Sequence, residues 1–316
     1  KKRRCFIKIN IKKPIVFLFG PTASGKTDIA IKLADKFPIE IISVDSVMVY
    51  KDCDIGSAKP DINILKKYPH HLIDMVSPNQ IFTVAEFCKF SKQIVKEIHN
   101  KGKLPLFVGG SMMYFKSLYE GIHNLPLRDE VFRKELRKIN SNDNLYSLLN
   151  EIDPVYAAKL NKNDEVRIIR ALEIHKITGK TLSQILNEDN KEPITNDYTV
   201  FQFGIIDERS LIHERIKERL DNIISMGLED EAKKILKKYE IQDEHPIRKS
   251  VNYKQIFDYL EGREDFDSFK NKALFATRQL AKKQDTWLRS WKMFTKIRIN
   301  ESAKLENDIK KALSFL

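Results

Sequence analysis

The sequence predicts an α/β protein in which a parallel sheet is flanked by helices, with an all-α insertion and a helical C-terminal part. Along the first 120 residues, short apolar runs alternate with amphipathic stretches of helical period. Residues 121–197 then show helical patterns only, and the apolar run at residues 199–206 returns to the strand pattern. Strands that are joined by helical crossovers lie parallel in one sheet, so this order predicts one α/β core interrupted by a helical insertion.

The positive charge of the chain is concentrated at its start. Of the formal net charge of +12, +7 comes from residues 1–13, which contain no acidic residue, so residues 14–316 carry only +5. We therefore treat residues 1–13 as a basic tail, residues 14–120 and 198–316 as the α/β core, and residues 121–197 as the insertion. A mild positive excess is only a weak indication of a polyanionic partner.

The composition gives no sign of a membrane or an exported protein. No apolar run approaches the length of a membrane span, and no secretory signal is visible. The cysteines Cys5, Cys53 and Cys88 are odd in number and widely spaced, which argues against a disulfide framework and against a zinc site. We expect a cytoplasmic protein without a membrane segment.

A glycine-rich turn, GPTASGKT at residues 20–27, joins the strand at residues 15–19 to the next helix. Its spacing fits the P-loop pattern, in which backbone N–H groups and a helix N-terminus surround a phosphate. Lys26 adds a positive charge, and the Thr27 hydroxyl is a suitable ligand for Mg²⁺. The turn predicts a P-loop NTPase-like sheet with a phosphate site, and it leaves open whether ATP or another phosphate compound binds. The predicted binding residues are Gly20, Pro21, Thr22, Ala23, Ser24, Gly25, Lys26 and Thr27.

Polar residues follow the next two predicted strands. The strand at residues 40–44 ends in Asp45-Ser46, and the strand at residues 104–108 ends in Gly109-Gly110-Ser111. Ligands of open α/β sheets bind beyond the carboxyl ends of the strands, so these segments and the P-loop are predicted to share one crevice. For Asp45 this position leaves three roles open: a general base, a group linked to a metal, or a structural cap.

Several basic and histidine-containing segments permit both a functional and a structural interpretation. Arg215 and Arg219, four apart on one helix, either neutralise a diphosphate or form a solvated face. The predicted long helix at residues 265–292 carries Arg278 and Lys282 near two tryptophans, which suits a nucleic-acid surface or an amphipathic core helix. His70-His71 is expected to be a packed or hydrogen-bonded pair.

Six segments, in order and at consistent separation, resemble the tRNA dimethylallyltransferase family, the isopentenyl transferases of bacterial type. The resemblance runs from residue 15 to about residue 291. The segments are GPTASGKT (20–27), DSVMVYKDCDIGSAKP (45–60), HHLID (70–74), VGGSMMYFKSL (108–118), NDEVRIIRALEIHKITGK (163–180) and ATRQLAKKQDTWLR (276–289).

The resemblance implies transfer of a dimethylallyl group from dimethylallyl diphosphate to the exocyclic amine of the adenosine 3′-adjacent to the anticodon of tRNA, with Mg²⁺ as cofactor. Carried over by position, Asp45 would accept the proton from the amine. Lys26, Thr27 and Thr22 would hold diphosphate and metal, and Arg219 would lie against the phosphates. The anticodon stem-loop is the implied partner, with the helical insertion closing over it, and we expect a monomer.

The resemblance also implies a set of tRNA-binding residues on five segments. These residues are Asp45, Ser46, Val47, Met48, Ser111, Val166, Arg167, Ile168, Ile169, Arg170, Lys249, Ser250, Val251, Asn252, Tyr253, Lys254, Arg278 and Lys282.

The chain departs from the family pattern at several of these segments. Ser57 and Ser111 stand where the family usually has threonine, Met48 where it favours glutamine, Asn252 where it has glycine, and Lys283 where it has arginine. Asparagine tolerates a left-handed backbone best among the other residues, so the turn at Asn252 is expected to survive.

Two other classes of protein would also contain this P-loop. A kinase for a small molecule or nucleotide would explain the P-loop and Asp45, but not the helical insertion or the basic helix with tryptophans. An RNA-binding protein that uses the phosphate site as a switch is the third class.

Overall fold

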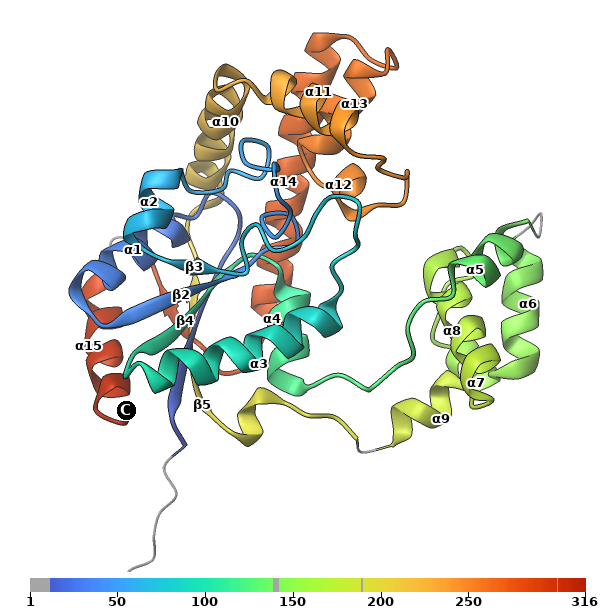
Figure 1. Ribbon diagram of the computed structural model, residues 1–316, viewed down its shortest axis with the longest axis horizontal. Helices are drawn as coiled ribbons and strands as arrows, with labels where there is room; N and C mark the ends of the chain where they lie inside the picture. Colours follow the sequence, from blue (N-terminus) through green and yellow to red (C-terminus); the bar gives the residue numbers. More distant parts are fainter. Residues whose placement is uncertain (1–11, 139–141, 189, 300) are drawn as a thin grey trace, which may run out of the picture. The chain divides into compact units, whose positions relative to one another are not determined.

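The computed structural model describes residues 12–138, 142–188, 190–299 and 301–316. The chain forms two compact units, one of Lys1–Tyr119 with Ile194–Leu316 and the other of Glu120–Pro193 (Figure 1). The basic tail predicted at residues 1–13 lies almost wholly outside the described residues, as does Cys5.

The first unit is built on a parallel sheet of six strands, as the sequence predicts. Their order is β3-β2-β4-β1-β5-β6, and every neighbouring pair is parallel. The strands are β1 (Pro14–Phe19), β2 (Ile39–Val44), β3 (His70–His71), β4 (Leu104–Gly109), β5 (Thr199–Ile205) and β6 (Thr295–Ile297). The short edge strands β3 and β6 are the two that the sequence pattern does not reveal.

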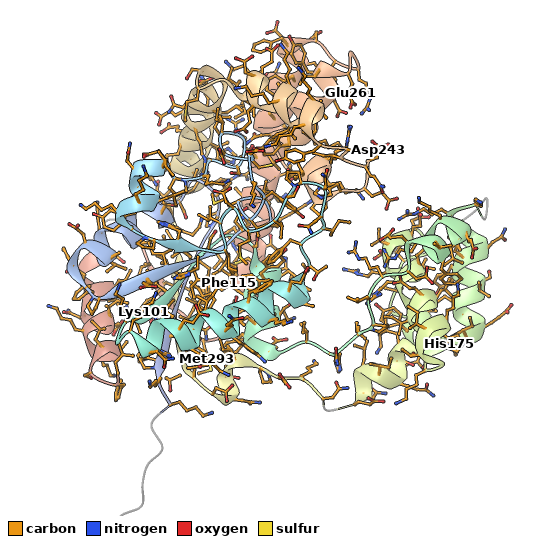
Figure 2. The ribbon with its side chains drawn as sticks, viewed as in Figure 1. Lys101, Phe115, His175, Asp243, Glu261 and Met293 are labelled. Atoms are coloured by element: carbon orange, nitrogen blue, oxygen red, sulfur yellow. The ribbon has the colours of Figure 1, made fainter. Side chains whose placement is uncertain are left out.

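Helices cover both faces of the sheet, which explains why its central strands are apolar throughout. On one face, Val16 and Leu18 of β1 pack in a core with α1 (Lys26–Lys36) and α15 (Ser302–Leu313). On the other face, the Phe17 and Phe19 rings lie 5.1 and 5.3 Å from the ring of Phe115. Phe115, which is labelled in Figure 2, belongs to α4 (Met112–Glu120). The helix α3 (Val84–Asn100) covers the same side as α4 (Figure 1).

The helix α3 begins and ends where its sequence predicts. The Thr83 hydroxyl accepts a hydrogen bond from the backbone N–H of Glu86, whose carboxylate accepts from the N–H of Thr83. The chain leaves the helix at Gly102, which has a φ of +66°. Residues 52–78 contain the short helix α2 (Ile62–Lys67), which Asp61 caps, and the strand β3.

The last third of the first unit is helical, apart from β6. The 3-10 helix η1 (Ile194–Asn196) leads into β5. Between β5 and β6 the chain forms five helices: α10 (Arg209–Ser225), α11 (Leu228–Lys238), α12 (Pro246–Lys249), α13 (Tyr253–Leu260) and α14 (Phe266–Ser290). The predicted long helix at residues 265–292 is confirmed as α14, which Asp265 caps. The helix packs on α10 through Ala281, which contacts Ile212 and Ile216.

The second unit is helical and has a core of its own. It contains α5 (Glu130–Arg137), α6 (Asn142–Ile152), α7 (Pro154–Ala157), α8 (Glu165–Thr178) and α9 (Leu182–Asn187). Within its apolar core, the buried Glu173 carboxylate accepts hydrogen bonds of 2.7 and 2.8 Å from Arg133 and a further one from Arg170. Burial opposes the charge of Glu173, but these hydrogen bonds lower its pKa to about 2.

Over the described part of the chain, none of the helices is both long and apolar enough to cross a membrane.

Candidate active site

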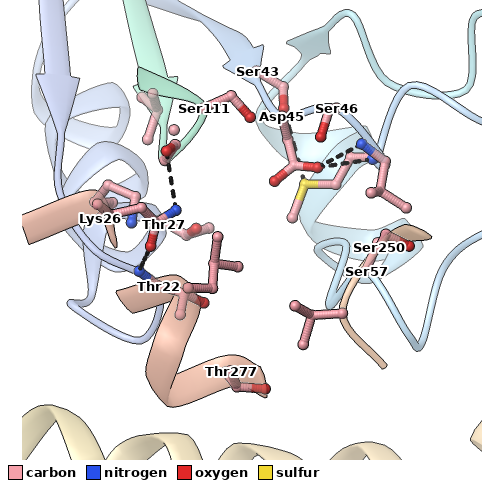
Figure 3. Close-up of a pocket in the computed structure, with 18 of the residues that line it drawn as sticks. Thr22, Lys26, Thr27, Ser43, Asp45, Ser46, Ser57, Ser111, Ser250 and Thr277 are labelled. Atoms are coloured by element: carbon pink, nitrogen blue, oxygen red, sulfur yellow. Dashed lines mark hydrogen bonds between the residues drawn. The ribbon is translucent and has the colours of Figure 1, made fainter. Parts of the chain in front are cut away.

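A cavity of about 630 Å³ opens at the carboxyl ends of β1, β2 and β4. The three segments that the sequence predicts to converge all line it, with Thr22 from the P-loop, Asp45 after β2 and Ser111 after β4. Figure 3 shows Thr22, Lys26 and Thr27 on one side of this cavity, and Asp45, Ser46, Ser57 and Ser250 on the other. The helices α10 and α14 and the turn between α12 and α13 complete its wall. All of these residues belong to the first unit.

The P-loop has the backbone geometry that its glycines predict. Gly25 has a φ of +75°, and a Cβ at Gly20 would lie 3.0 Å from the Ser24 hydroxyl oxygen and 3.1 Å from the Cβ of Ile205. Thr22, Lys26 and Thr27 line the cavity, whereas the other loop residues shape the turn. Those shaping residues are Gly20, Pro21, Ala23, Ser24 and Gly25.

Two cations face the cavity on the P-loop side. The Lys26 ammonium donates a 2.6 Å hydrogen bond to the Pro21 carbonyl, and Arg219 reaches the same cavity from α10. Burial and the nearby Arg219 charge lower the pKa of Lys26 to about 7, against the opposing effect of Asp45. Burial also lowers the pKa of Arg219.

Neither Lys26 nor Arg219 forms an ion pair with a carboxylate of the described residues. Arg215, on the same helix as Arg219, instead has its Nη1 atom 3.6 Å from Oδ2 of Asp207. Lys26 and Arg219 are partly buried, and the Asp45 charge offsets their mutual repulsion only in part. A ligand with several negative oxygens would remove the rest of this repulsion. The geometry therefore fits an anion such as a diphosphate.

The two carboxylate oxygens of Asp45 have different surroundings. Its Oδ1 atom accepts hydrogen bonds from the backbone N–H groups of Val47 (2.8 Å) and Met48 (3.1 Å). The other carboxylate oxygen is free of these bonds and faces the cavity (Figure 3). One oxygen thus fixes the carboxylate, and the other is available to accept a proton or to bind a metal.

Gln284 of α14 connects two walls of the cavity. Its Oε1 accepts a 2.8 Å hydrogen bond from the N–H of Thr22, and its Nε2 donates a 3.0 Å hydrogen bond to the Gly110 carbonyl. A Cβ on Gly110 would lie 2.3 Å from that Nε2, which explains the glycine. Gln284 is not among the site residues predicted from the sequence, although it lies in one of the six segments and is a buried polar side chain.

Apart from the buried Tyr253, the predicted tRNA-binding residues of the first unit divide into those that line the cavity and those that lie outside its lining. Eight line the cavity beside Asp45: Ser46, Val47, Met48, Ser111, Lys249, Ser250, Val251 and Asn252. Arg278, Lys282 and Lys254 lie outside its lining, and Lys254 shares a second hollow with Lys249. From α14, the residues that reach the cavity include Thr277, Leu280, Lys283 and Trp287.

Three of the predicted RNA contacts are contradicted by burial. Tyr253 is 0% exposed and lies beneath the cavity wall, and Ile168 and Ile169 are 0% and 1% exposed in the core of the second unit. A side chain without exposed surface cannot contact RNA, so these three are structural residues. On the same helix, Val166 and Arg167 are exposed.

Arg170 is also engaged within the protein. Its guanidinium donates to the Glu173 carboxylate and to the Pro126 carbonyl, so two of its five N–H donors are already used. Arg167 pairs only with Asp164 at the surface, at 2.9 Å. Of the two arginines predicted to contact RNA from α8, Arg167 is the more exposed, at 67% of its side chain against 25% for Arg170.

Two further expectations concern local geometry, and both are confirmed. Asn252 adopts a positive φ of +73°, so the turn survives without the glycine of the family pattern. The two histidines are hydrogen-bonded, His70 to the Tyr68 carbonyl and His71 to Glu40.

The residues around the P-loop fit a magnesium ion that is held through phosphate oxygens. Thr27 offers a hydroxyl in the cavity, and Asp45 offers a carboxylate oxygen. The described residues contain no cluster of three or more His, Cys, Asp or Glu side chains that could hold a metal alone. Mg²⁺ commonly binds in this way, through one or two protein ligands and the phosphates of the substrate.

Comparison with known proteins identifies relatives along most of the chain. A family model described as IPP transferase matches residues 48–291. The chain is 44% identical over 285 residues to a tRNA dimethylallyltransferase of Legionella pneumophila strain Corby, covering 89% of this chain and 90% of the relative. It is 40% identical over 279 residues to a tRNA dimethylallyltransferase of Nitrosomonas eutropha, covering 87% of each.

Solved structures agree with these sequence relatives. The full-length tRNA isopentenylpyrophosphate transferase of Bacillus halodurans matches with a TM-score of 0.69 and 32% identity, covering 96% of this chain and 97% of that one. A eukaryotic dimethylallyltransferase acting on tRNA has a TM-score of 0.79 at 23% identity, with 95% and 80% covered, which is a likeness of fold.

Proposed function

The chain belongs to the IPP transferase family, and from this premise we propose that it transfers a dimethylallyl group from dimethylallyl diphosphate to the N6 amine of the adenosine 3′-adjacent to the anticodon in tRNA. The family predicted from the six sequence segments is confirmed, and the chain is an enzyme of the prenyltransferase class. The observation that carries the proposal is the position of Lys26 and Arg219 in the same cavity as the free oxygen of Asp45.

The cations on the P-loop side suit the departure of a diphosphate. When the allylic C–O bond breaks, negative charge builds on the diphosphate oxygens. Lys26, Arg219 and the N–H groups of the P-loop are in place before the reaction, so they stabilise this charge without rearrangement. Bound Mg²⁺, held by Thr27 and the phosphates, would supply further neutralisation of the same charge.

Asp45 is suited to the acceptor half of the reaction. The N6 amine forms a bond to C1 of the dimethylallyl group as the C–O bond breaks, and the amine must then lose a proton. The oxygen of Asp45 that faces the cavity accepts this proton, while the other oxygen stays bonded to Val47 and Met48. Diphosphate leaves on the P-loop side of the cavity, where Lys26 lies (Figure 3).

The RNA would approach along the wall that carries Lys249, Lys283 and Trp287. Lysines are suited to phosphodiester contacts, and an exposed tryptophan is suited to stacking on a base. The target adenosine must leave its stack to reach Asp45, at a cost of about a few kcal/mol. We propose that the second unit closes over the anticodon stem-loop and that the protein acts as a monomer in the cytoplasm.

A transfer assay tests the proposal directly. Purified protein is incubated with Mg²⁺, dimethylallyl diphosphate and an anticodon stem-loop that carries adenosine at the target position, and the nucleosides are analysed by mass spectrometry. We expect one isopentenyl group on that adenosine, and none on a stem-loop with guanosine there. Phosphorylation of a small acceptor with ATP, without prenyl transfer, would instead favour the kinase, which the family membership does not support.

A further inference from the structure

The wall of the cavity beside Asp45 includes a loop without regular structure. Gly56, Ser57 and Pro60 line the cavity from this loop, which precedes the short helix α2. Neither a helix nor a strand fixes these residues, although the loop contributes to the surface on which an acceptor base would lie. Their position must therefore come from contacts with other parts of the fold.

Glu231 of α11 holds the backbone of this loop. Its Oε2 accepts hydrogen bonds from the N–H groups of Asp54 (3.0 Å) and Ile55 (2.7 Å), and its Oε1 accepts from the N–H of Gly56 (2.9 Å). A fourth donor, the Tyr253 hydroxyl, lies 2.6 Å from Oε1. A carboxylate has about four lone-pair positions, so all of them are used.

The environment of Glu231 distinguishes it from an ordinary ion-pair partner. It is 9% exposed, and no lysine, arginine or histidine of the described residues lies at ion-pair distance from it. Its hydrogen bonds to the loop backbone join residues 175 to 177 positions apart in the chain. The carboxylate thus accepts hydrogen bonds from three consecutive backbone N–H groups and does not pair with a cation.

Gly56 is held from two further directions. The Asn252 side-chain amide donates a 2.9 Å hydrogen bond to the Gly56 carbonyl, and a Cβ on Gly56 would lie 2.6 Å from the Tyr253 ring. The Tyr253 ring packs against Gly56, and it is therefore buried although the residues before it in the chain line the cavity. Asn252 stands where the family pattern has glycine, so this amide bond is a feature of the present chain.

We propose that Glu231 is a positioning residue for the transfer reaction, which fixes the loop of Asp54 to Pro60 so that the acceptor adenosine docks beside Asp45. The inference rests on the proposed function. Glu231 touches neither substrate and acts through Gly56 and its neighbours. The loop lies on the side of Asp45, away from Lys26 (Figure 3), so the loss of Glu231 should affect the RNA acceptor and not the diphosphate.

The substitution Glu231→Gln tests this role with little change in shape. A glutamine oxygen accepts two hydrogen bonds, and its NH₂ group faces the other two donors, which are then left unpaired. We expect kcat/KM for the anticodon stem-loop to fall by about ten- to a hundredfold. The affinity for inorganic diphosphate with Mg²⁺, measured by calorimetry, should stay within about twofold of wild type.

The matched control is Glu229→Gln on the same helix. Glu229 is 38% exposed and pairs with Lys233 at the surface, so the change should leave both measurements at the wild-type level. A loss for the control equal to that of Glu231→Gln would overturn the proposal, as would an unchanged kcat/KM in Glu231→Gln. An equal loss of diphosphate affinity would also overturn it, because that result would indicate general damage.

Amide hydrogen exchange separates this inference from the proposed function. In Glu231→Gln, the amides of Asp54, Ile55 and Gly56 should exchange faster, while those of β4 keep their protection. Wild-type protein without transfer activity would overturn the proposed function, while the exchange data would still show whether Glu231 holds the loop. Unchanged exchange at the three amides would overturn the positioning role even in an active enzyme.

A second variant keeps the test decisive if Glu231→Gln does not fold. Tyr253→Phe removes one of the four donors and keeps the buried ring against Gly56. We expect a smaller loss of kcat/KM for the stem-loop, about two- to fivefold, with diphosphate affinity unchanged. A loss in diphosphate affinity, or none in kcat/KM, would count against the proposal.

Discussion

Lys26 and Arg219 face one cavity as two like charges, one from the P-loop and the other from α10. Burial, and after it the charge of Arg219, lowers the pKa of Lys26 to about 7, and Asp45 offsets this only in part. A bound anion would reverse the shift, because negative oxygens favour the protonated ammonium. The protonation state of the P-loop lysine therefore depends on whether the site is occupied.

The first prediction concerns proton uptake on binding. At pH 8 the free Lys26 is about nine-tenths neutral, so binding of diphosphate with Mg²⁺ should take up close to one proton, and affinity should fall as pH rises above about 7. Below about pH 6 the lysine is already charged, and this dependence should vanish. Calorimetry in two buffers with different ionisation enthalpies measures the uptake. The same pH slope in Lys26→Met would contradict the assignment.

The second prediction separates chemistry from binding at Asp45. In Asp45→Asn the Oδ1 atom still accepts from Val47 and Met48, so the turn should persist, but the group can no longer take a proton. We expect single-turnover transfer to slow by about 10²- to 10⁴-fold while the stem-loop dissociation constant changes by less than about threefold. Asp267→Asn, at an exposed carboxylate in the first turn of α14, should transfer at the wild-type rate. Loss of RNA binding with intact transfer on saturating RNA would refute the role as base.

The third prediction concerns the bridge made by Gln284. Gln284→Leu leaves the Thr22 N–H and the Gly110 carbonyl without their partner, at a cost of about 1–3 kcal/mol, so affinity for diphosphate should fall by about tenfold. Gly110→Ala should have a similar effect, because its Cβ would displace the same amide. The two losses should not add in the double variant, since each removes one shared contact. Additive losses, measured by calorimetry, would show that the bridge is not the common cause.

The fourth prediction separates the two arginines of α8. Arg167 is exposed, so Arg167→Ala should leave stability within about 0.5 kcal/mol and reduce the salt slope of RNA binding by about one. Arg170→Ala removes a donor from the buried Glu173 and should lower the free energy of unfolding by about 1–3 kcal/mol. Urea denaturation and salt titrations of stem-loop binding measure both effects. A salt slope that changes only in Arg170→Ala would reverse the assignment.

The elements with strong local signals could be predicted from the sequence. The P-loop, the capped helix α3 and the long helix α14 are defined by spacing, caps and periodicity within one segment. The edge strand β3 could not be found in this way, because it has two residues and exists only through its pairing with β2.

The residues that face the cavity at the strand ends could be predicted from the sequence, but the residues that hold the surrounding backbone in place could not. Lys26, Asp45 and Ser111 follow directly from strand ends, which always meet at one edge of a parallel sheet. Gln284 and Glu231 act across more than 170 residues of chain, and no local pattern specifies such a contact. Ile168 and Ile169 were misassigned because the family segment was carried over as a block, whereas burial differs along a helix from one residue to the next.

The order of the cavity residues along the chain has a consequence for biosynthesis. The P-loop is translated early, but Arg219 and Gln284, which complete its surroundings, are translated after the whole helical unit. The strand β1 also pairs with β5 and packs in one core with α15, and both elements are translated much later. In a nascent chain, the P-loop is therefore synthesised long before the other residues that line its cavity. The proposed donor, dimethylallyl diphosphate, would stabilise only a chain that extends through residue 284, if it binds the folded state alone.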